Sequence, residues 1–450
     1  MVLNGLTLTN TDPGIIFNNP GNQELAIGDT LTLPLVNPNN MDITWATSQL
    51  PTGIYVSGYT NTSISFISSQ NITSTVIYIT AISGNFMYTI NFKIGVISTT
   101  FTTLILSSIV GLSLFLNFGG VSAISGDGNT IVVGYNGHNA LNGYVGVYKY
   151  SSGSWNTATS LTIAQSGTTT TQLGTSVAIS TDGTTIVGCS YNGWIGVWKY
   201  SNNAWNVATQ LIHTNNKARA VAITPDGNTV VLGGAYYLSG LYGYVGVWTY
   251  SNNSWSSVTN LSIPTSNTQA GISIAISADG NTIVAGDTAY NSSQGQLLVW
   301  KYTNNSWGSY TTIRNSNLMV NAQLGTAVSI NNDGTIIAAS APGDNWIGVW
   351  YYTNNTWGTP TQMPSTGLTH NSLGNAITMN KDGNIIIATE KSNSRLIIWT
   401  YANGWKYQTV LTNGAVLGTA NLGNSVSMND NNTIIISNTN TYEFTSVWYI

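Results

Sequence analysis

Charged side chains are scarce in this chain. Asp, Glu, Lys and Arg account for 6% of its 450 residues, whereas they make up roughly 25% of an average soluble domain. Lys and Arg together number 11 and Asp and Glu 15, which leaves a net charge of −4. This balance argues against a nucleic-acid partner and against an anionic membrane surface, because both are recognised by clustered positive charge. The surface must therefore be neutral and rich in amides and hydroxyls.

Cysteine and histidine are scarce as well, which limits redox and metal chemistry. The single cysteine, Cys189, cannot form an intramolecular disulfide, and its apolar surroundings in the sequence predict a buried, inert thiol. The histidines, His138, His213 and His370, accompany no His-x-His pair and no Cys/His cluster, so we expect isolated loop or surface histidines. The sequence predicts no metal site and no cofactor.

The beginning of the chain and its longest apolar run carry no targeting signal. Residues 1–9 lack the basic and apolar regions of a secretory signal peptide, which predicts synthesis in the cytosol. Residues 101–118 are apolar and uncharged, but their Ser, Thr, central Gly and many β-branched residues favour two buried strands over a membrane helix. We therefore expect no membrane span.

A repeat extends from residue 119 to the end of the chain. Each copy begins with an apolar strand, a turn of the type Asp-Gly-Asn and a second apolar strand. Asp-Gly between two apolar runs predicts a type I′ β-hairpin, in which both central residues have positive φ. The seven copies carry at this turn Asp127, Asp182, Asp226, Asp279, Asp333, Asp382 and Asn431. The turn alone accounts for the six aspartates.

The second half of most copies contains the motif Gly-Val-Trp-x-Tyr or a variant of it, an Asn-rich turn and a second Trp seven residues after the first. Because Asn tolerates positive φ, this half reads as a second hairpin, and the whole copy is a unit of four antiparallel strands. The Trp pairs are Trp198 and Trp205, Trp248 and Trp255, Trp300 and Trp307, and Trp350 and Trp357, with the variants Tyr148 and Trp155, and Trp399 and Trp405. We expect these rings to fill the space between neighbouring units.

Seven four-stranded units in succession predict an all-β chain with a seven-bladed β-propeller at residues 98–450. The seventh unit ends with its third strand, so we expect residues 101–107 to complete the blade made by 424–450. Such a three-plus-one clasp would close the ring without an exposed sheet edge. Residues 1–97 lack the repeat and contain short strands separated by turn signals, which predicts an N-terminal β-sandwich.

Three resemblances point to binding or display. The repeat resembles the FG-GAP repeats of integrin-α-like propellers, on the run Leu173-Gly-Thr-Ser-Val-Ala-Ile-Ser followed by Gly-Val-Trp-x-Tyr. The calcium loops of that family need several closely spaced Asp residues, which the single Asp of each turn does not supply. The run Thr224-Pro-Asp-Gly is similar to the turn of WD-repeat proteins. Residues 42–97, with Trp45 and Leu50-Pro-Thr-Gly-Ile, resemble Ig/cadherin-like domains of surface proteins.

Propellers also include sialidases, and the run Ser277-Ala-Asp-Gly-Asn-Thr-Ile is similar to their Asp-box but departs from it at two points. Those enzymes bind a substrate carboxylate with three arginines. Arg219, Arg314 and Arg395 occupy non-equivalent positions of the repeat, and the sequence shows no Tyr and Glu pair that would act as nucleophile. A sialidase-like hydrolase therefore ranks third among the functions considered.

The loops between the second and third strands of each unit contain the best candidates for a binding surface. They vary in length and combine aromatic rings with Asn and Gly, a composition that suits neutral contacts with sugars or proteins. The candidate binding residues are Tyr135, Tyr191, Trp194, Tyr236, Tyr244, Tyr290 and Trp346. The alternative is that these rings cap the edges of the blades.

The sequence thus predicts a non-enzymatic structural or attachment protein that binds other proteins through propeller loops. A composition rich in Asn, Ile and Thr and poor in charge resembles virion proteins of large DNA viruses and phages. This resemblance implies a minor capsid or surface component, located on a virion or cell surface after cytosolic synthesis. A carbohydrate-binding lectin propeller is the alternative, so the expected partners are other virion or surface proteins, or glycans.

Overall fold

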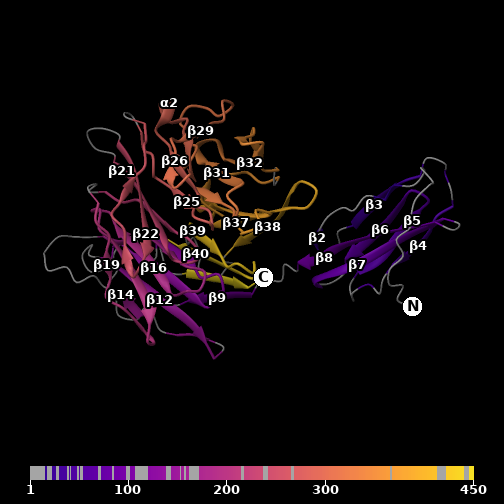
Figure 1. Cartoon of the computed structure of the whole chain (residues 1–450), viewed down its shortest axis with the longest axis horizontal. Coiled ribbons are helices and arrows are strands. Elements are labelled where there is room, and N and C mark those ends of the chain that lie inside the picture. Colours follow the sequence, from indigo (N-terminus) through magenta and orange to yellow (C-terminus); the bar gives the residue numbers. More distant parts are fainter. Residues whose placement is uncertain are drawn as a thin grey trace. The chain divides into compact units, whose positions relative to one another are not determined.

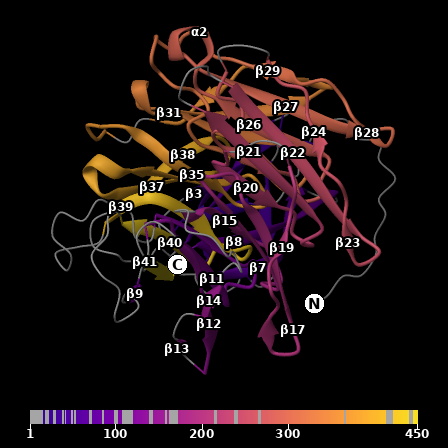
Figure 2. The ribbon, with the colours of Figure 1, turned by 90° about the vertical axis from the view of Figure 1, so that its left-hand side faces the viewer.

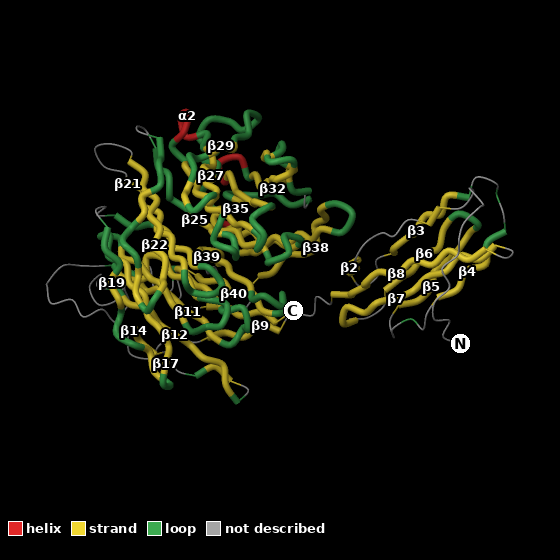
Figure 3. The backbone as a smooth tube through the Cα atoms, viewed as in Figure 1, coloured by secondary structure: helices red, strands yellow, loops and turns green. Residues whose placement is uncertain are grey.

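Strands make up most of the structure of this chain (Figure 3). The computed structural model describes residues 16–17, 23–26, 30–37, 40, 42–47, 50, 54–68, 72–83, 86–97, 102–106, 120–137, 143–152, 154–156, 159–161, 172–213, 217–236, 242–264, 268–364, 367–412, 422–439 and 445–449. The helical elements in these ranges are single turns: α2 (Tyr290–Ser293), η1 (Pro342–Asp344) and η2 (Lys391–Asn393). The chain is therefore all-β, as predicted. It divides into two compact units, Met1–Thr100 together with Ile450 (unit 1) and Phe101–Tyr449 (unit 2).

Unit 1 contains two four-stranded sheets (Figure 1). Their strand orders are β1 (Ile16–Phe17), β3 (Thr30–Val36), β6 (Ser63–Ser68) and β5 (Ile54–Thr60), and β2 (Gln23–Ala26), β8 (Phe86–Ile97), β7 (Ile72–Ser83) and β4 (Thr44–Thr47). Side chains of β3 alternate between exposed and buried, as expected for a strand with one face on a core. Both sheets contribute to one apolar cluster, which contains Leu31, Leu33, Ile54, Ile64, Phe66, Ile77, Ile79 and Ile90.

Unit 2 contains seven antiparallel sheets, named sheets 1 to 7 in chain order. Three consecutive strands form the body of each: β10 (Val121–Ile124), β11 (Thr130–Tyr135) and β12 (Tyr144–Ser151); β15 (Leu173–Ile179), β16 (Thr185–Ser190) and β17 (Ile195–Ser201); β20 (Ala220–Ile223), β21 (Thr229–Tyr236) and β22 (Tyr242–Ser251); β25 (Ile274–Ile276), β26 (Thr282–Asp287) and β27 (Gln296–Thr303); β30 (Val328–Ile330), β31 (Ile336–Ala341) and β32 (Trp346–Thr353); β35 (Leu373–Met379), β36 (Ile385–Glu390) and β37 (Arg395–Tyr401); and β39 (Leu422–Met428), β40 (Ile434–Thr439) and β41 (Thr445–Tyr449).

The fourth strand of sheets 1 to 5 is split into two short pieces that both pair with the third strand. The pieces are β13 (Ser154–Trp155) and β14 (Thr159–Leu161), β18 (Ala204–Trp205) and β19 (Thr209–Gln210), β23 (Ser254–Trp255) and β24 (Thr259–Asn260), β28 (Ser306–Trp307) and β29 (Thr311–Ile313), and β33 (Thr356–Trp357) and β34 (Thr361–Gln362). Tyr200 pairs with Trp205 whereas Val197 pairs with Thr209, so one extra residue separates the pieces as a β-bulge. Sheet 6 has a single fourth strand, β38 (Trp405–Thr412), with a register shift in it.

The first turn of each copy is a hairpin turn, but the prediction that it is of type I′ is wrong. In sheet 1, only the glycine of the Asp-Gly pair has positive φ, at +76° for Gly128. The amide of Gly128 donates to the carbonyl of Ser125 at 3.0 Å. The Asp127 carboxylate accepts from the Ser125 hydroxyl at 2.5 Å and from the Asn129 amide at 2.9 Å. These bonds hold the aspartate inside a four-residue turn whose last residue is a glycine with positive φ. In such a turn the aspartate itself has right-handed backbone, with negative φ.

The Asn-rich turn of the second hairpin has the geometry that the Asp-Gly turn lacks. Two consecutive asparagines have positive φ in sheets 2 to 5, with 51° and 59° at Asn202 and Asn203. Positive φ at both central residues is the requirement of a type I′ turn, and asparagine is the non-glycine residue that meets it most readily. The prediction of a second hairpin in each of these copies is confirmed.

One tryptophan from the third strand of nearly every sheet is enclosed. Trp198, Trp248, Trp300, Trp350, Trp399 and Trp448 are among the largest fully buried side chains of the described residues. Trp198 of sheet 2 packs in one cluster with Val132, Val145 and Val147 of sheet 1. The rings therefore fill the space between neighbouring sheets, as predicted, and sheet 1 packs against sheet 7 through Ile131, Val133, Ile436 and Val447.

The seven sheets follow one another in a cycle, which Figure 2 shows as an ordered change of colour around unit 2. The first strands of consecutive sheets contact one another, and β39 of sheet 7 contacts β10 of sheet 1. Backbone hydrogen bonds join the first turns of neighbouring sheets, from Asp430 to Gly126 and from Gly126 to Thr181. β9 (Thr102–Leu106) pairs antiparallel with β41 and completes sheet 7, so the predicted pairing between these two segments is confirmed.

No helix in the part of the chain that the structure describes is long and apolar enough to cross a membrane. Of the apolar run at 101–118, residues 102–106 form β9, and the rest lies outside the described residues.

The pairing of β9 with β41 predicts a specific disulfide. Ile105 lies opposite Ser446, and opposite residues of antiparallel strands have Cα atoms within about 4.5–5.5 Å, a separation that a disulfide bridges. We expect the double variant Ile105→Cys, Ser446→Cys to oxidise to an intramolecular disulfide, detected by mass spectrometry after non-reducing digestion. Cys189 does not compete, because burial raises the pKa of its thiol to about 12.

The matched control is Ile105→Cys with Val447→Cys. Successive residues of a strand point to opposite faces, so this pair must stay reduced under the same oxidant. Equal cross-linking of the two pairs would contradict the register.

Candidate functional site

The aromatic residues expected to form a binding surface occupy two different environments. Tyr135, Trp194 and Trp346 are buried, with 3%, 9% and 6% of their surface exposed. The Tyr135 hydroxyl lies 3.0 Å from that of Tyr148, and the Trp194 ring lies 5.8 Å from the Trp198 ring, measured between centroids. For these three residues the structure favours the alternative interpretation, in which the rings cap the edges of the sheets.

The buried rings explain the glycine of the Gly-Val-Trp motif. Trp194 and Trp346 each lie over the glycine two positions later in the chain, Gly196 and Gly348. A Cβ on either glycine would overlap ring carbons of the tryptophan. The motif therefore records a packing requirement, in which a flat ring needs bare backbone beneath it.

We predict that Gly348→Ala destabilises unit 2. The added methyl group would overlap the Trp346 ring in a closed core, and overpacking of this kind costs about 1–3 kcal/mol. The measurement is the midpoint of chemical unfolding, followed by fluorescence. Gly308→Ala is the control, because a Cβ there meets its nearest neighbour, the Lys301 carbonyl, at an ordinary 3.6 Å. Similar losses in both variants would contradict the packing argument.

The remaining candidate rings are half-buried and lie in different sheets. Tyr191 has the Lys217 ammonium 4.4 Å and the Arg219 guanidinium 4.7 Å from its ring centroid. Tyr290 has the Arg314 guanidinium at 4.2 Å. Burial raises the pKa of Tyr244 to about 12. The side chain of Tyr236 lies outside the described residues. The structure therefore does not gather the seven candidates into one surface.

The same loop region of sheet 6 contains a buried ionic cluster centred on Glu390, which ends β36. Arg395 Nε donates to its carboxylate at 2.6 Å, and His370 Nδ1 lies at 3.1 Å from the same oxygen. The other oxygen accepts from the Asn371 amide at 2.5 Å and from Asn393 Nδ2 at 2.6 Å. The expectation of an isolated histidine is therefore wrong for His370.

The Glu390 cluster stabilises the loops of sheet 6 and is poorly suited to proton transfer. Burial alone would raise the pKa of Glu390, but the bonds from Arg395, Asn371, His370 and Asn393 outweigh it and hold the pKa below its ordinary value. Four donors converge on two carboxylate oxygens, so the group has little capacity left to accept a substrate proton. The cluster holds the connection between β36 and β37 and the segment that precedes β35.

We expect Glu390→Gln to lower the free energy of unfolding at pH 7 by about 3 kcal/mol, because it removes one partner of a buried charge pair. A depressed folded-state pKa contributes stability above the unfolded-state value and loses it as the pH falls through the folded-state value. The difference between the native protein and Glu390→Gln must therefore shrink below about pH 4. Denaturant unfolding from pH 3 to 7 measures it.

Asp382→Asn is the control for this series, since Asp382 is exposed at the turn of the same sheet. A difference for Glu390→Gln that stays constant down to pH 3 would show that the carboxylate charge contributes nothing.

Other titratable groups have structural partners too. His213 is half-buried, its Nε2 lies 2.6 Å from the Gly193 carbonyl, and burial lowers its pKa, so it is not the isolated residue expected. His138 lies outside the described residues. Arg314 Nε donates to Gln296 at 3.0 Å, and Gln296 donates to Asp287. Within the described ranges, no group of three His, Cys, Asp or Glu side chains could hold a metal ion.

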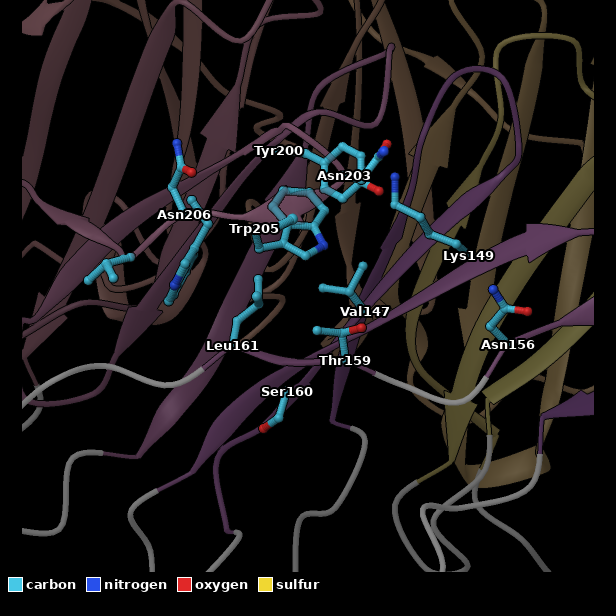
Figure 4. Close-up of a pocket in the computed structure, with 13 residues that line it drawn as sticks. Val147, Lys149, Asn156, Thr159, Ser160, Leu161, Tyr200, Asn203, Trp205 and Asn206 are labelled. Atoms are coloured by element: carbon cyan, nitrogen blue, oxygen red, sulfur yellow. The ribbon is translucent and has the colours of Figure 1, made fainter.

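The outer ends of the sheets contain a site that the sequence analysis missed. In the second hairpin of sheet 2, Tyr200 and Trp205 are cross-strand neighbours with ring centroids 5.2 Å apart. The Lys149 ammonium, from sheet 1, lies 3.6 Å from the Tyr200 ring centroid. These three side chains line a groove of about 860 Å³ at the junction of sheets 1 and 2, together with Asn156, Asn203 and Asn206 (Figure 4).

Similar grooves lie at the next two junctions. The groove between sheets 2 and 3 measures about 730 Å³, and that between sheets 3 and 4 about 770 Å³. Each has a Tyr and Trp pair and an Asn-rich wall, as the repeat dictates. The signal in the sequence was the recurring pattern Tyr-x-Asn-Asn-x-Trp, which Lys199 and Lys301 precede in two of its copies. This pattern can be read as a hairpin motif but not as the wall of a groove between sheets.

Comparison with known proteins shows which fold the chain contains. No model of a known protein family matches the chain, and no curated protein matches it in sequence. In structure it is similar to the β-propeller domain of Cps50 (Swd1) from Myceliophteria thermophila, with a TM-score of 0.56 and 11% identity over 78% of this chain and all of that domain. The chain thus contains a β-propeller, as predicted, and at this identity the likeness shows the fold alone.

Proposed function

We propose that this chain is a non-enzymatic interaction protein, built as an Ig-like β-sandwich at residues 1–97 and a seven-bladed β-propeller at residues 98–450. The seventh blade is the three-plus-one clasp of β39, β40 and β41 with β9. The propeller binds other proteins as a minor capsid or surface component of a virion, or at a cell surface. Its surface loops, and among the candidate rings the half-buried Tyr191, Tyr244 and Tyr290, provide the contacts.

The observation that carries this proposal is that many of the few charged groups are already engaged within the chain. The aspartates of the first turns accept bonds from their own turns, as Asp182 does from Ser180 and Thr184. Glu390 is buried among donors, and lysines lie over tyrosine rings. A surface of amides, hydroxyls and rings loses little solvation free energy when another protein covers it, because few free ions must be dehydrated.

An enzymatic role has no comparable support. The three arginines that a sialidase-like reading requires lie in three different environments: Arg219 beside Tyr191, Arg314 beside Tyr290 and Gln296, and Arg395 on Glu390. A lectin is the stronger alternative, because the outer grooves combine Tyr and Trp rings with Asn side chains, which suit stacking and hydrogen bonding to sugars.

We expect this protein to be enriched in purified virus particles at a fixed ratio to the major capsid protein. Quantitative mass spectrometry of particles from the source, beside the free soluble fraction, measures this ratio. A structural role requires constant stoichiometry across preparations, whereas a contaminant varies.

Absence from particles would overturn the virion assignment. A glycan array then separates the two remaining binding roles: a signal reduced by Trp205→Ala and Trp307→Ala, in the outer grooves, would support the lectin.

A further inference from the structure

Lysines tie three of the junctions between neighbouring sheets. The side chains of Lys149, Lys199 and Lys301 each extend from a third strand to the Tyr ring of the next sheet. The distances from ammonium to ring centroid are 3.6, 3.2 and 4.0 Å, to Tyr200, Tyr250 and Tyr352. A second ring, the Trp of the same hairpin, lies within 5.9 Å of each ammonium. Each contact is a cation–π interaction between sheets.

The junction of sheets 3 and 4 lacks this lysine. Thr249 occupies the equivalent position, since it pairs with Thr229 as Lys199 pairs with Thr185 and Lys301 with Thr282. Tyr302 and Trp307 keep their cross-strand contact, with centroids 5.3 Å apart. Among the residues that the structure describes, no cation lies over either ring. The groove therefore presents two aromatic rings that suit a cation, and no cation of the described residues occupies them.

Two further features make this junction more open than its neighbours. Thr181 of sheet 2 donates its backbone amide to Pro225 of sheet 3, and Ala278 of sheet 4 donates to sheet 5. Pro225 has no amide hydrogen, so it cannot make the corresponding bond to sheet 4. A Cβ built on Gly280 would lie 3.5 Å from the nearest atom of sheet 3, whereas one on Gly227 would lie 2.8 Å from sheet 2.

The open junction also exposes a negative charge. Asp279 lines this groove together with Thr249, Tyr302 and Trp307, whereas no aspartate lines the grooves that Lys149 and Lys199 fill. Burial alone would raise the pKa of Asp279, but bonds from Ser277 and Asn281 and the nearby Lys301 lower it below its ordinary value. The carboxylate is therefore ionised at neutral pH, and its charge complements an incoming ammonium.

We propose that the groove between sheets 3 and 4 binds the ammonium group of a lysine side chain from a partner protein. The ammonium takes the place over Tyr302 and Trp307 that an internal lysine takes at three other junctions, and Asp279 faces its charge. This inference rests on the proposed role as a protein-binding scaffold and names one contact of that role. It commits to an ammonium rather than a sugar because the chain itself places ammonium groups on three equivalent ring pairs.

The test uses the full chain labelled with 5-fluorotryptophan, whose fluorine resonances are resolved by NMR. The Trp307 resonance is assigned by its loss in Trp307→Phe. The probe is Nα-acetyl-lysine methylamide, and the matched neutral probe is Nα-acetyl-norleucine methylamide. We expect the lysine probe to shift the Trp307 resonance saturably, at concentrations at least about tenfold lower than norleucine requires, because only the lysine carries the charge.

Two substitutions at one position separate the site from general effects on folding. Thr249→Lys supplies the internal ammonium and must weaken the response of Trp307 to the lysine probe by at least about tenfold. Thr249→Val has nearly the same shape without charge and must keep the response. The other tryptophan resonances report whether each variant retains its fold.

The proposal is overturned if the lysine probe leaves Trp307 unmoved, if norleucine moves it equally, or if Thr249→Lys and Thr249→Val behave alike. A shift with galactose but not with lysine would overturn it in favour of the lectin alternative. The probe experiment needs no virus particle, so its failure leaves the virion assignment standing. Conversely, absence of the chain from particles leaves the ammonium site intact.

Discussion

The architecture of unit 2 depends on one packing interaction, the insertion of a third-strand tryptophan between its own sheet and the preceding one. Trp198 against Val132, Val145 and Val147 is the first example. An indole buries more apolar area than any other side chain, so a repeated Trp sets a uniform separation between sheets and supplies much of the free energy that holds them together. Sheet 1 has Tyr148 at this position, and its hydroxyl pairs with that of Tyr135, because a buried hydroxyl needs a partner.

The third-strand tryptophans do not fill the junctions completely, and grooves remain between neighbouring sheets. The bulge in the fourth strand and the Tyr and Trp pair of the second hairpin occupy part of this space. A lysine suits the remainder, since its methylene chain packs along the sheet while its ammonium reaches the next ring. Lys149, Lys199 and Lys301 each also lie near a turn aspartate, so cation, ring and carboxylate form one connected arrangement.

Features with local causes could be predicted from the sequence. Strand alternation, hairpin spacing and an incomplete last unit depend on neighbouring residues and on the arithmetic of the repeat, and they led to the propeller and to the pairing of β9 with β41. Features that depend on packing across the chain could not. The burial of Trp194 is set by bare backbone at Gly196, and the position of His370 by a carboxylate on another strand. The turn type was missed because the Ser125 hydroxyl, outside the Asp-Gly pair, fixes the aspartate.

Repetition makes exceptions informative. Sheets 1, 2 and 4 place a lysine at one register position of the third strand, whereas Thr249, Tyr351 and Thr400 occupy it in sheets 3, 5 and 6. The junction of sheets 3 and 4 differs from its two neighbours in two ways, and two differences at one junction are harder to attribute to drift than one. Pro225 removes a backbone bond and Thr249 removes a cation, and both changes affect the same pair of sheets. The cycle of sheets tolerates such a junction because the contacts at the other junctions and the pairing of β9 with β41 hold the cycle closed. Because the sheets stay in a closed cycle without a lysine at this junction, the rings of Tyr302 and Trp307 and the carboxylate of Asp279 are available to a ligand.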